Sequence, residues 1–292
     1  MPEEITIEIN PGTATLEKLK KYKQIGINRL SIGLQSANNQ LLEELGRIHN
    51  FQDFVNTYNF AKEAGFSNIN VDFMIGLPNQ KIEDIKTSLE KVLSFKPTHI
   101  SVYSLIVEEN TQISNMIENG SLKLPEENLE RNMYWYVKNY LELSGFKHYE
   151  ISNFARPGLE SKHNLDCWEQ KEYVGFGLAA HSYTDGVRYS NISNINEYIK
   201  NCIENRFDKN IIIHEKQSKS DMEKEYMLLG LRKIEGVSIQ NFKNKFNENP
   251  IFTFKNELSK LVEEKLLIID DDKIKLTNKG LDLANIVWEE FI

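Results

Sequence analysis

The sequence is poor in cysteine. Only Cys167 and Cys202 occur among its 292 residues. Two thiolates cannot complete a four-cysteine zinc site, and they cannot supply the three or four ligands that an iron–sulfur cluster usually takes. So few cysteines are typical of a reducing compartment, and we expect a cytoplasmic protein.

Long apolar runs and a surplus of positive charge are also absent. No stretch approaches the roughly 20 apolar residues that a membrane-spanning helix needs, so we expect no integral membrane segment. The N-terminus, MPEEITIEINP, lacks the pattern of a signal peptide. The formal net charge is −8. Because nucleic-acid binding depends on clustered Lys and Arg, we expect no nucleic-acid partner.

The first hundred residues alternate strand and helix patterns. The expected helices run from Thr15 to Gly26 and over Asn38–Leu45, Phe51–Ala64 and Ile82–Ser94. The expected strands are Glu4–Ile9, Arg29–Gly33, Asn68–Ile75 and His99–Leu105. Strands joined by helical crossovers pair in parallel. A full eightfold barrel typically needs about 250 residues. Because the alternation covers only about the first hundred residues, the pattern predicts part of a (β/α) barrel or an open α/β sheet.

The rest of the chain has a different character. Residues 111–149 are mainly helical, with an aromatic-rich helix over Met133–Leu143, and residues 151–190 are rich in loops. From residue 216, three helices and a β-hairpin predict a winged-helix-like domain, whose wing carries three consecutive aspartates that disfavour contact with DNA. We therefore divide the chain into residues 1–110, 111–215 and 216–292.

Polar residues follow the predicted strands. Ligands of α/β proteins bind at the C-terminal ends of the strands. The residues at or near these ends are Glu8, Asn10, Gln35, Arg47, Asp72, Ser101, Tyr103 and Ile106. Carboxylates accept hydrogen bonds from ammonium and hydroxyl groups, and Arg47 could bind a carboxylate. The alternative for Glu8 or Asp72 is contact with solvent or an ion pair with Arg47, since an unpaired buried carboxylate is costly.

Several segments resemble one known family. EITIEINPGT, GINRLSIGLQSANNQLLEELGRIH, INVDFMIGLPNQ and PTHISVYSL resemble the oxygen-independent coproporphyrinogen III oxidase group of radical S-adenosylmethionine proteins. YEISNFARPG, HNLDCW, YVGFGLAAHSY and EKEYMLLGLR resemble the haem-chaperone branch of that group. The resemblance implies an α/β fold, namely a partial (β/α)₆ barrel followed by a small helical, winged-helix-like C-terminal domain.

The resemblance also implies a cofactor site. Glu8, Gln35, Arg47 and Asp72 fall on positions that bind S-adenosylmethionine, and Ile106 falls on a position that adds backbone or apolar contact. The family's CxxxCxxC loop, which holds a [4Fe–4S] cluster, is missing from this sequence. We therefore expect that this chain alone neither binds the cluster nor cleaves S-adenosylmethionine. A separate polypeptide could supply the missing N-terminal barrel strands by pairing with the exposed sheet edge.

A second candidate site lies at residues 163–168. HNLDCW resembles the HNxxYW signature proposed to bind haem, with Cys167 in the tyrosine position. Histidine and thiolate both serve as axial haem ligands. His163 is the haem candidate, with a hydrogen-bonded structural histidine as the alternative, and Cys167 is either a ligand or a small packed side chain. His148 and His181 are more typical of structural histidines.

Three functions remain open at this point. The leading hypothesis is a haem-binding protein that transfers haem to a haem-accepting protein. The alternatives are an oxygen-independent oxidase that decarboxylates coproporphyrinogen III, and an inactive truncated homologue. We assign neither catalytic residues nor metal ligands from the sequence.

Overall fold

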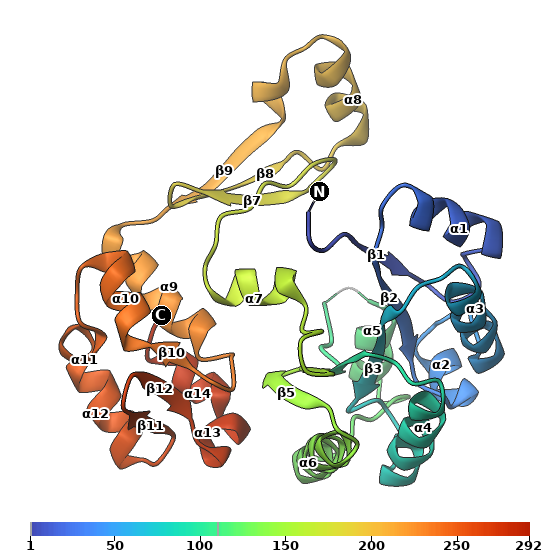
Figure 1. Cartoon of the computed structure of the whole chain (residues 1–292), viewed down its shortest axis with the longest axis horizontal. Helices are drawn as coiled ribbons and strands as arrows, with labels where there is room; N and C mark the ends of the chain where they lie inside the picture. Colours follow the sequence, from blue (N-terminus) through green and yellow to red (C-terminus); the bar gives the residue numbers. More distant parts are fainter. Residues whose placement is uncertain (1, 110) are drawn as a thin grey trace. The chain divides into compact units, whose positions relative to one another are not determined.

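The computed structural model describes residues 2–109 and 111–292, and it divides into two compact units. The first unit ends at Lys162 and the second begins at His163 (Figure 1). No helix within the described ranges is long and apolar enough to cross a membrane.

The first unit is built on a six-stranded sheet with strand order β1-β2-β3-β4-β6-β5. The strands are β1 Thr6–Ile9, β2 Arg29–Gln35, β3 Asn68–Ile75, β4 His99–Ser104, β5 Lys147–Glu150 and β6 Asn153–Ala155. The helices are α1 Leu16–Gln24, α2 Asn39–Glu44, α3 Phe51–Glu63, α4 Ile82–Ser94, α5 Gln112–Glu118 and α6 Glu127–Leu143. Strands β1 to β4 pair in parallel and in sequential order, as the sequence predicts.

Helices α1 and α3 begin where the sequence provides capping residues. Thr15 accepts a hydrogen bond from the Lys18 N–H at the start of α1. Asn50 and Asp53 form a reciprocal capping box at the start of α3. Such side chains satisfy backbone N–H groups that have no partner within the helix, which fixes the helix start.

The hairpin of β5 and β6 was not predicted. β6 pairs antiparallel with β4, so residues 147–155 extend the sheet beyond its parallel part. The sequence indicated a helix end followed by a loop here. Strands of four and three residues are too short to produce a clear alternation of polar and apolar residues.

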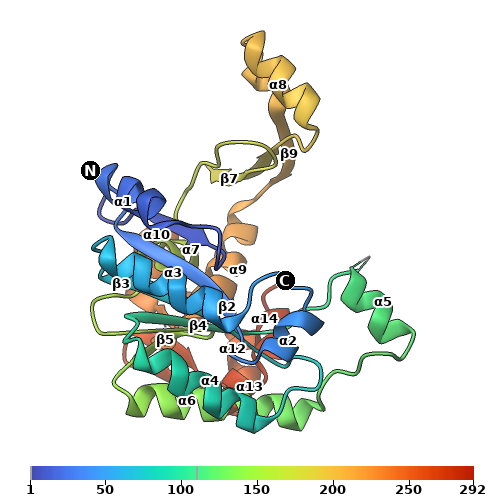
Figure 2. The same cartoon turned by 90° about the vertical axis from the view of Figure 1, so that its right-hand side faces the viewer.

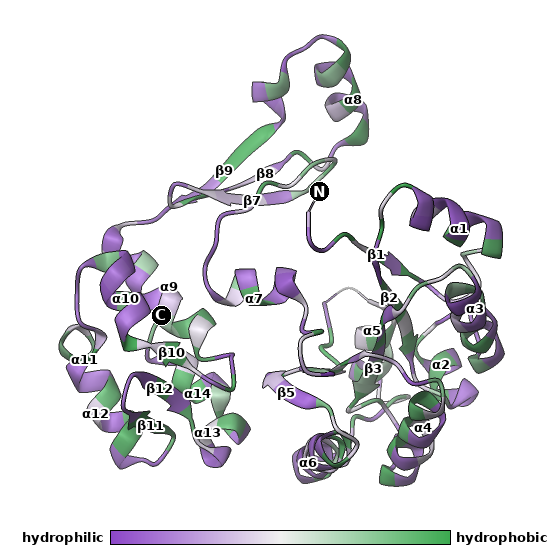
Figure 3. Ribbon diagram, in the orientation of Figure 1, coloured by the Kyte–Doolittle hydropathy of each residue, from purple (hydrophilic) through white to green (hydrophobic). Residues whose placement is uncertain are grey.

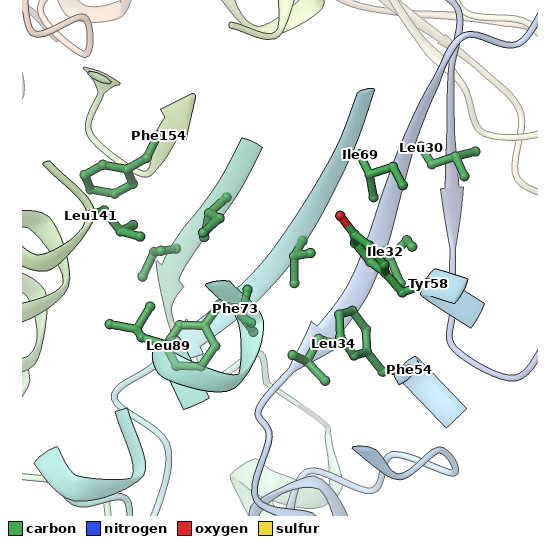
Figure 4. Close-up of a cluster of buried hydrophobic side chains, with 14 of the residues drawn as sticks. Leu30, Ile32, Leu34, Phe54, Tyr58, Ile69, Phe73, Leu89, Leu141 and Phe154 are labelled. Carbon is green, nitrogen blue, oxygen red and sulfur yellow. The ribbon is translucent and has the colours of Figure 1, made fainter. Parts of the chain in front are cut away.

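The sheet has one apolar and one polar face, because successive side chains of a strand point to opposite sides. The apolar face packs against helices α3, α4 and α6 (Figure 4). Figure 2 shows α3 and α4 along the same side of the sheet. Fully burying one such apolar side chain contributes roughly 1.5–3 kcal/mol. The main members of this core are Leu30, Ile32, Leu34, Phe54, Tyr58, Ile69, Phe73, Leu89, Leu141 and Phe154.

The second unit contains two three-stranded sheets, with strand orders β7-β8-β9 and β10-β12-β11. The strands are β7 His181–Thr184, β8 Val187–Asn191, β9 Ile211–Lys216, β10 Val237–Ser238, β11 Leu267–Asp270 and β12 Lys273–Leu276. Helix α7, Lys162–Trp168, begins at the last residue of the first unit. The other α-helices of the second unit are α8 Ile195–Ile203, α9 Lys219–Gly230, α10 Ile239–Phe246, α11 Pro250–Thr253, α12 Lys255–Glu263, α13 Asn278–Asp282 and α14 Ala284–Glu289, and η1 Phe207–Asn210 is a 3-10 helix.

The C-terminal part agrees with the predicted winged-helix-like domain. Helices α9, α10 and α12 and the hairpin of β11 and β12 match the predicted order of three helices followed by a β-hairpin. They enclose a core of their own that includes Phe242, Leu261 and Ile274. The sheet of β7, β8 and β9 was not predicted. Strand β7 and most of β8 lie in residues 151–190, which were expected to be rich in loops, and β9 lies beyond them. All six residues of β9 are exposed, and Figure 3 shows much of this strand in the hydrophobic colour.

The three-part domain division stays a prediction, and the two compact units group the middle segment differently. The boundary between the two compact units falls after Lys162, within residues 111–215. Helix α6 and strands β5 and β6 belong to the first unit, because β6 is hydrogen-bonded to β4. Strands β7, β8 and β9 belong to the second unit.

Candidate functional site

Asp72 lies at the centre of the polar face of the first sheet. The Ser31 hydroxyl donates to both carboxylate oxygens at 3.2 Å, and the Asn70 amide donates to Oδ1 at 2.6 Å. Burial raises the pKa of Asp72, and the negative charge of Glu8 adds to this shift. Hydrogen bonds from Asn70, Ser31 and Ser101 oppose it. The strand interior thus holds a carboxylate that neighbouring donors satisfy.

A series of buried hydrogen bonds connects Asn70 to His99 and Tyr149. The Asn70 carbonyl oxygen lies 2.6 Å from His99 Nδ1, and His99 Nε2 lies 2.8 Å from the Tyr149 hydroxyl. The Ser161 N–H donates to the same hydroxyl at 3.3 Å. Burial holds the pKa of His99 well below its usual value, so the ring is neutral. Because Asn70 donates to Asp72, its carbonyl accepts from the Nδ1–H of His99, and Tyr149 donates to Nε2.

Gln35 and Tyr103 meet at the ends of β2 and β4. Gln35 has a left-handed φ of 69° next to a register shift that begins at Gly33. Its side chain is buried and accepts a hydrogen bond from the Tyr103 hydroxyl at 3.2 Å. A Cβ on Gly33 would lie 3.0 Å from the Gln35 amide nitrogen, so glycine leaves room for this side chain. Burial and then the charge of Asp72 raise the pKa of Tyr103 far above its usual value.

Glu8 and Arg47 lie around the same tyrosine. Glu8 is exposed on β1, in register with Ser31 of β2. An Arg47 guanidinium nitrogen donates to the Asn10 side-chain oxygen at 3.3 Å, just beyond β1. The charges of Glu8 and Arg47 both act on the Tyr103 hydroxyl.

The structure thus gathers Glu8, Gln35, Arg47 and Asp72 around Tyr103. Ile106 lies just past β4 with a side chain that is 78% exposed, so it faces solvent. The sequence identified Tyr103 only as a strand-end residue. Tyr103 lies two residues after Ser101 in β4, so both side chains point to the same face of the sheet. This spacing is the sequence signal that could have placed Tyr103 in the cluster.

A separate cleft lies elsewhere on the first unit. It encloses about 690 Å³ and is lined by α2, the loop before α4 and the segment before α6. Its walls include Glu44, Lys81, Asp84 and Lys123. None of the predicted ligand residues lines this cleft, so we place the candidate site on the polar sheet face.

The second candidate site is helix α7. His163 is exposed, and its Nε2 lies 3.8 Å from the sulfur of Cys167, one helical turn later. These two side chains therefore share one face of the helix. Both are accepted haem-iron ligands in proteins.

The cysteines of the chain do not fit an iron–sulfur cluster. Such a cluster usually takes at least three thiolates, and the chain has only Cys167 and Cys202. Within residues 2–109 and 111–292, no group of three or more His, Cys, Asp or Glu side chains could hold a metal ion.

Trp168 at the end of α7 contacts an arginine from a distant part of the sequence. The Arg232 guanidinium lies 4.5 Å from the Trp168 ring and 4.7 Å from the Trp288 ring. Arg232 is the last residue of the EKEYMLLGLR segment, and nothing in the sequence connects this segment with HNLDCW. Only the folded second unit brings these segments together.

Glu225 of α9 adds a second connection nearby. Its carboxylate accepts hydrogen bonds from the Gln170 amide at 3.0 Å and the Gln217 amide at 3.1 Å. The Arg188 guanidinium of β8 also donates to it. Residues from three separate parts of the sequence therefore converge on one carboxylate.

Comparison with known proteins agrees with this architecture. The Radical SAM superfamily profile matches residues 2–92, and the HemN C-terminal domain profile matches residues 217–283. Coproporphyrinogen III oxidase (HemN) from Escherichia coli superposes with a TM-score of 0.82 at 21% identity, covering 99% of this chain and 69% of that one. This likeness confirms the predicted α/β fold with its C-terminal domain.

Two curated relatives are similar along nearly the whole chain. The heme chaperone HemW of Lactococcus lactis subsp. lactis (strain IL1403) is 39% identical over 291 residues, which cover 99% of this chain and 76% of that protein. HemW of Bacillus subtilis (strain 168) is 40% identical over 289 residues, with the same two coverages. The chain therefore belongs to the HemW family of heme chaperones within the radical S-adenosylmethionine superfamily.

Proposed function

We propose that this protein binds haem through helix α7 and passes it to a haem-accepting protein. The observation that carries this proposal is the shared face of His163 and Cys167, whose side-chain Nε2 and Sγ atoms are 3.8 Å apart. The HemW relatives are named heme chaperones, which supports haem as the cargo.

His163 is the favoured iron ligand. Its side chain is exposed, whereas Cys167 is half-buried, so the imidazole is the more accessible of the two groups. A neutral imidazole binds haem iron directly. Cys167 on the same face would then lie beside the bound haem.

Haem titration followed by the Soret band tests this assignment. Wild-type protein should bind haem with an imidazole-type spectrum, His163→Ala should weaken binding at least about tenfold, and Cys167→Ser should keep the wild-type spectrum. A thiolate-type spectrum that is lost in Cys167→Ser would instead assign the iron to Cys167. Absence of haem binding by the folded wild-type chain would refute the proposal and favour an inactive homologue.

S-adenosylmethionine is the ligand we propose for the polar face of the first sheet. Glu8 and Asp72 offer carboxylates to its ammonium and ribose hydroxyl groups, and Arg47 offers a guanidinium to its carboxylate. Gln35 and Tyr103 are hydrogen-bonded to each other and lie among these charged groups. We propose that Ile106, whose side chain is exposed, adds an apolar contact. When bound, S-adenosylmethionine supplies an adenosyl group on an activated sulfonium.

The oxidase alternative has less support. The likeness to coproporphyrinogen III oxidase is at 21% identity and concerns the fold. The two cysteines of this chain do not fit the cluster that radical chemistry requires. Decarboxylation of coproporphyrinogen III would be the assay for this alternative.

A partner that contributes further barrel strands stays a prediction. In the described residues, β1 is an edge strand that pairs with β2. An edge strand offers free backbone N–H and C=O groups to another strand. A strand of the partner that pairs with β1 would extend the sheet at the edge formed by its parallel strands.

A further inference from the structure

We propose that Arg232 is a positioning residue for the haem-binding helix. Arg232 holds the Trp168 ring next to the Trp288 ring. This contact sets the orientation of α7, and with it the direction of the helix face that carries His163. This inference rests on the proposed function. Trp168 belongs to the haem signature. In this proposal its role is to anchor α7 and not to contact haem.

The geometry of the three side chains supports an anchor. Both ring centroids lie within 6 Å of the Arg232 guanidinium, the range of a favourable cation–π contact. A planar guanidinium can stack on aromatic rings, which the compact ammonium of lysine cannot do. Among the described residues, the buried indole N–H groups of Trp168 and Trp288 have no hydrogen-bond partner. The cation–π contacts with Arg232 are therefore the directional contacts that the structure shows for both rings.

Helix α7 depends on such contacts because it is short. It has seven residues, none of them buried. A helix of this length is not stable on its own and takes its orientation from tertiary packing. The chain just after it is held as well, since the Gln170 amide donates to the Met222 carbonyl at 3.1 Å and to Glu225 at 3.0 Å. These two attachments together determine the direction of α7 relative to the C-terminal domain.

The position of Trp168 relative to the ligands makes the anchor relevant to haem. His163 and Cys167 lie on one face of α7, and Trp168 ends the helix with its ring on Arg232. If Trp168 is released, the helix can rotate or fray, and the imidazole no longer has a fixed place for the iron. Haem affinity should then fall although neither ligand has changed.

The first test is hydrogen exchange on the haem-free chain. We expect Arg232→Lys to speed amide exchange in residues 163–168 at least about threefold relative to wild type. The matched control is Arg206→Lys, which alters an arginine paired with Glu204 outside this cluster. This readout does not depend on haem binding, so it separates failure of the anchor from failure of the proposed function. Unchanged exchange in Arg232→Lys would overturn the proposal.

The second test is the haem titration of the same variants. Arg232→Lys and Trp288→Leu should each raise the haem dissociation constant roughly three- to tenfold, while Arg206→Lys should not. The Soret position should stay of the imidazole type, because the ligand itself is intact. Circular dichroism identifies variants that fail to fold, and Trp168→Phe provides a milder change that keeps an aromatic ring on Arg232. Wild-type haem affinity in folded Arg232→Lys and Trp288→Leu would contradict the positioning role.

Discussion

His148 shows how burial governs the chemistry of single residues in the first unit. Its ring stacks on Phe154 at 4.4 Å between centroids, and its Nε2 lies 3.3 Å from the Ile151 carbonyl oxygen. Burial is the largest cause that lowers the pKa of His148 to about 4. The structure confirms a structural histidine here, as the sequence favoured.

This shift predicts a pH-dependent stability. The folded pKa of His148 is depressed, so the unfolded chain binds the proton more readily. Stability should therefore fall as the pH drops from about 6.5 towards 4, by about 3 kcal/mol for this group. Urea unfolding across this pH range should give a shallower slope for His148→Gln than for wild type. Some slope should remain, because burial also lowers the pKa of His99.

An identical slope in His148→Gln and wild type would contradict this account of the buried ring. The comparison uses the slope rather than the absolute stability, because the substitution also changes packing against Phe154.

At the residue scale, the sequence predicted Glu8 and Asp72 from their places in the strand pattern. It did not predict the contacts of Asn70, His99 and Tyr149, which depend on the register between strands and on the unexpected hairpin that carries Tyr149. Register is a tertiary property, because a polar residue within a strand does not indicate which neighbour lies opposite.

At the scale of elements, the run of three aspartates has a structural role that its charge alone did not indicate. Asp271 occupies the left-handed conformation of the β11–β12 turn with φ of 45°. Asp272 Oδ1 accepts the Gln240 N–H at 2.8 Å, and its Oδ2 accepts the Ser238 hydroxyl at 2.6 Å. Asp272 therefore joins the turn to the start of α10, where a negative charge is favourable.

Replacing Asp272 should destabilise this part of the protein. Asp272→Ala leaves two donors at the start of α10 unpaired, so Tm should fall by roughly a few degrees at neutral pH. Asp271→Asn is the matched control, since asparagine tolerates the left-handed turn. The Ser238 hydrogen bond lowers the pKa of Asp272. Its contribution is therefore complete above the usual carboxyl pKa and is lost as the pH falls through the depressed value.

Differential scanning calorimetry at neutral and acidic pH checks both parts of this expectation. Equal Tm values for Asp272→Ala and Asp271→Asn at neutral pH would show that the contact with α10 adds no stability.

The elements themselves were largely predictable from the sequence. Strand β3 and helix α4 begin and end where their patterns predict, because strong periodicity acts locally. The sheet of β7, β8 and β9 was missed because its strands are short and mix polar with apolar residues, so their pairing is decided by contacts across the sequence.

At the scale of the whole molecule, the candidate sites belong to different compact units. Glu8, Gln35, Arg47, Asp72 and Ile106 lie in the first unit, and His163 lies in the second. Each unit has its own hydrophobic core. The sequence resemblance indicated both sites, but it could not indicate that Arg232 contacts both Trp168 and Trp288 in the second unit, since a local sequence pattern does not determine packing partners.

The most direct test of the account is one crossed binding measurement on the full chain. Haem binding is followed by Soret absorbance and S-adenosylmethionine binding by equilibrium dialysis, for wild type, His163→Ala and Asp72→Asn. We predict that wild type binds both, that His163→Ala loses haem and keeps S-adenosylmethionine, and that Asp72→Asn does the reverse. Haem binding that is unchanged in folded His163→Ala, or absent from wild type, would contradict the central claim that α7 binds haem.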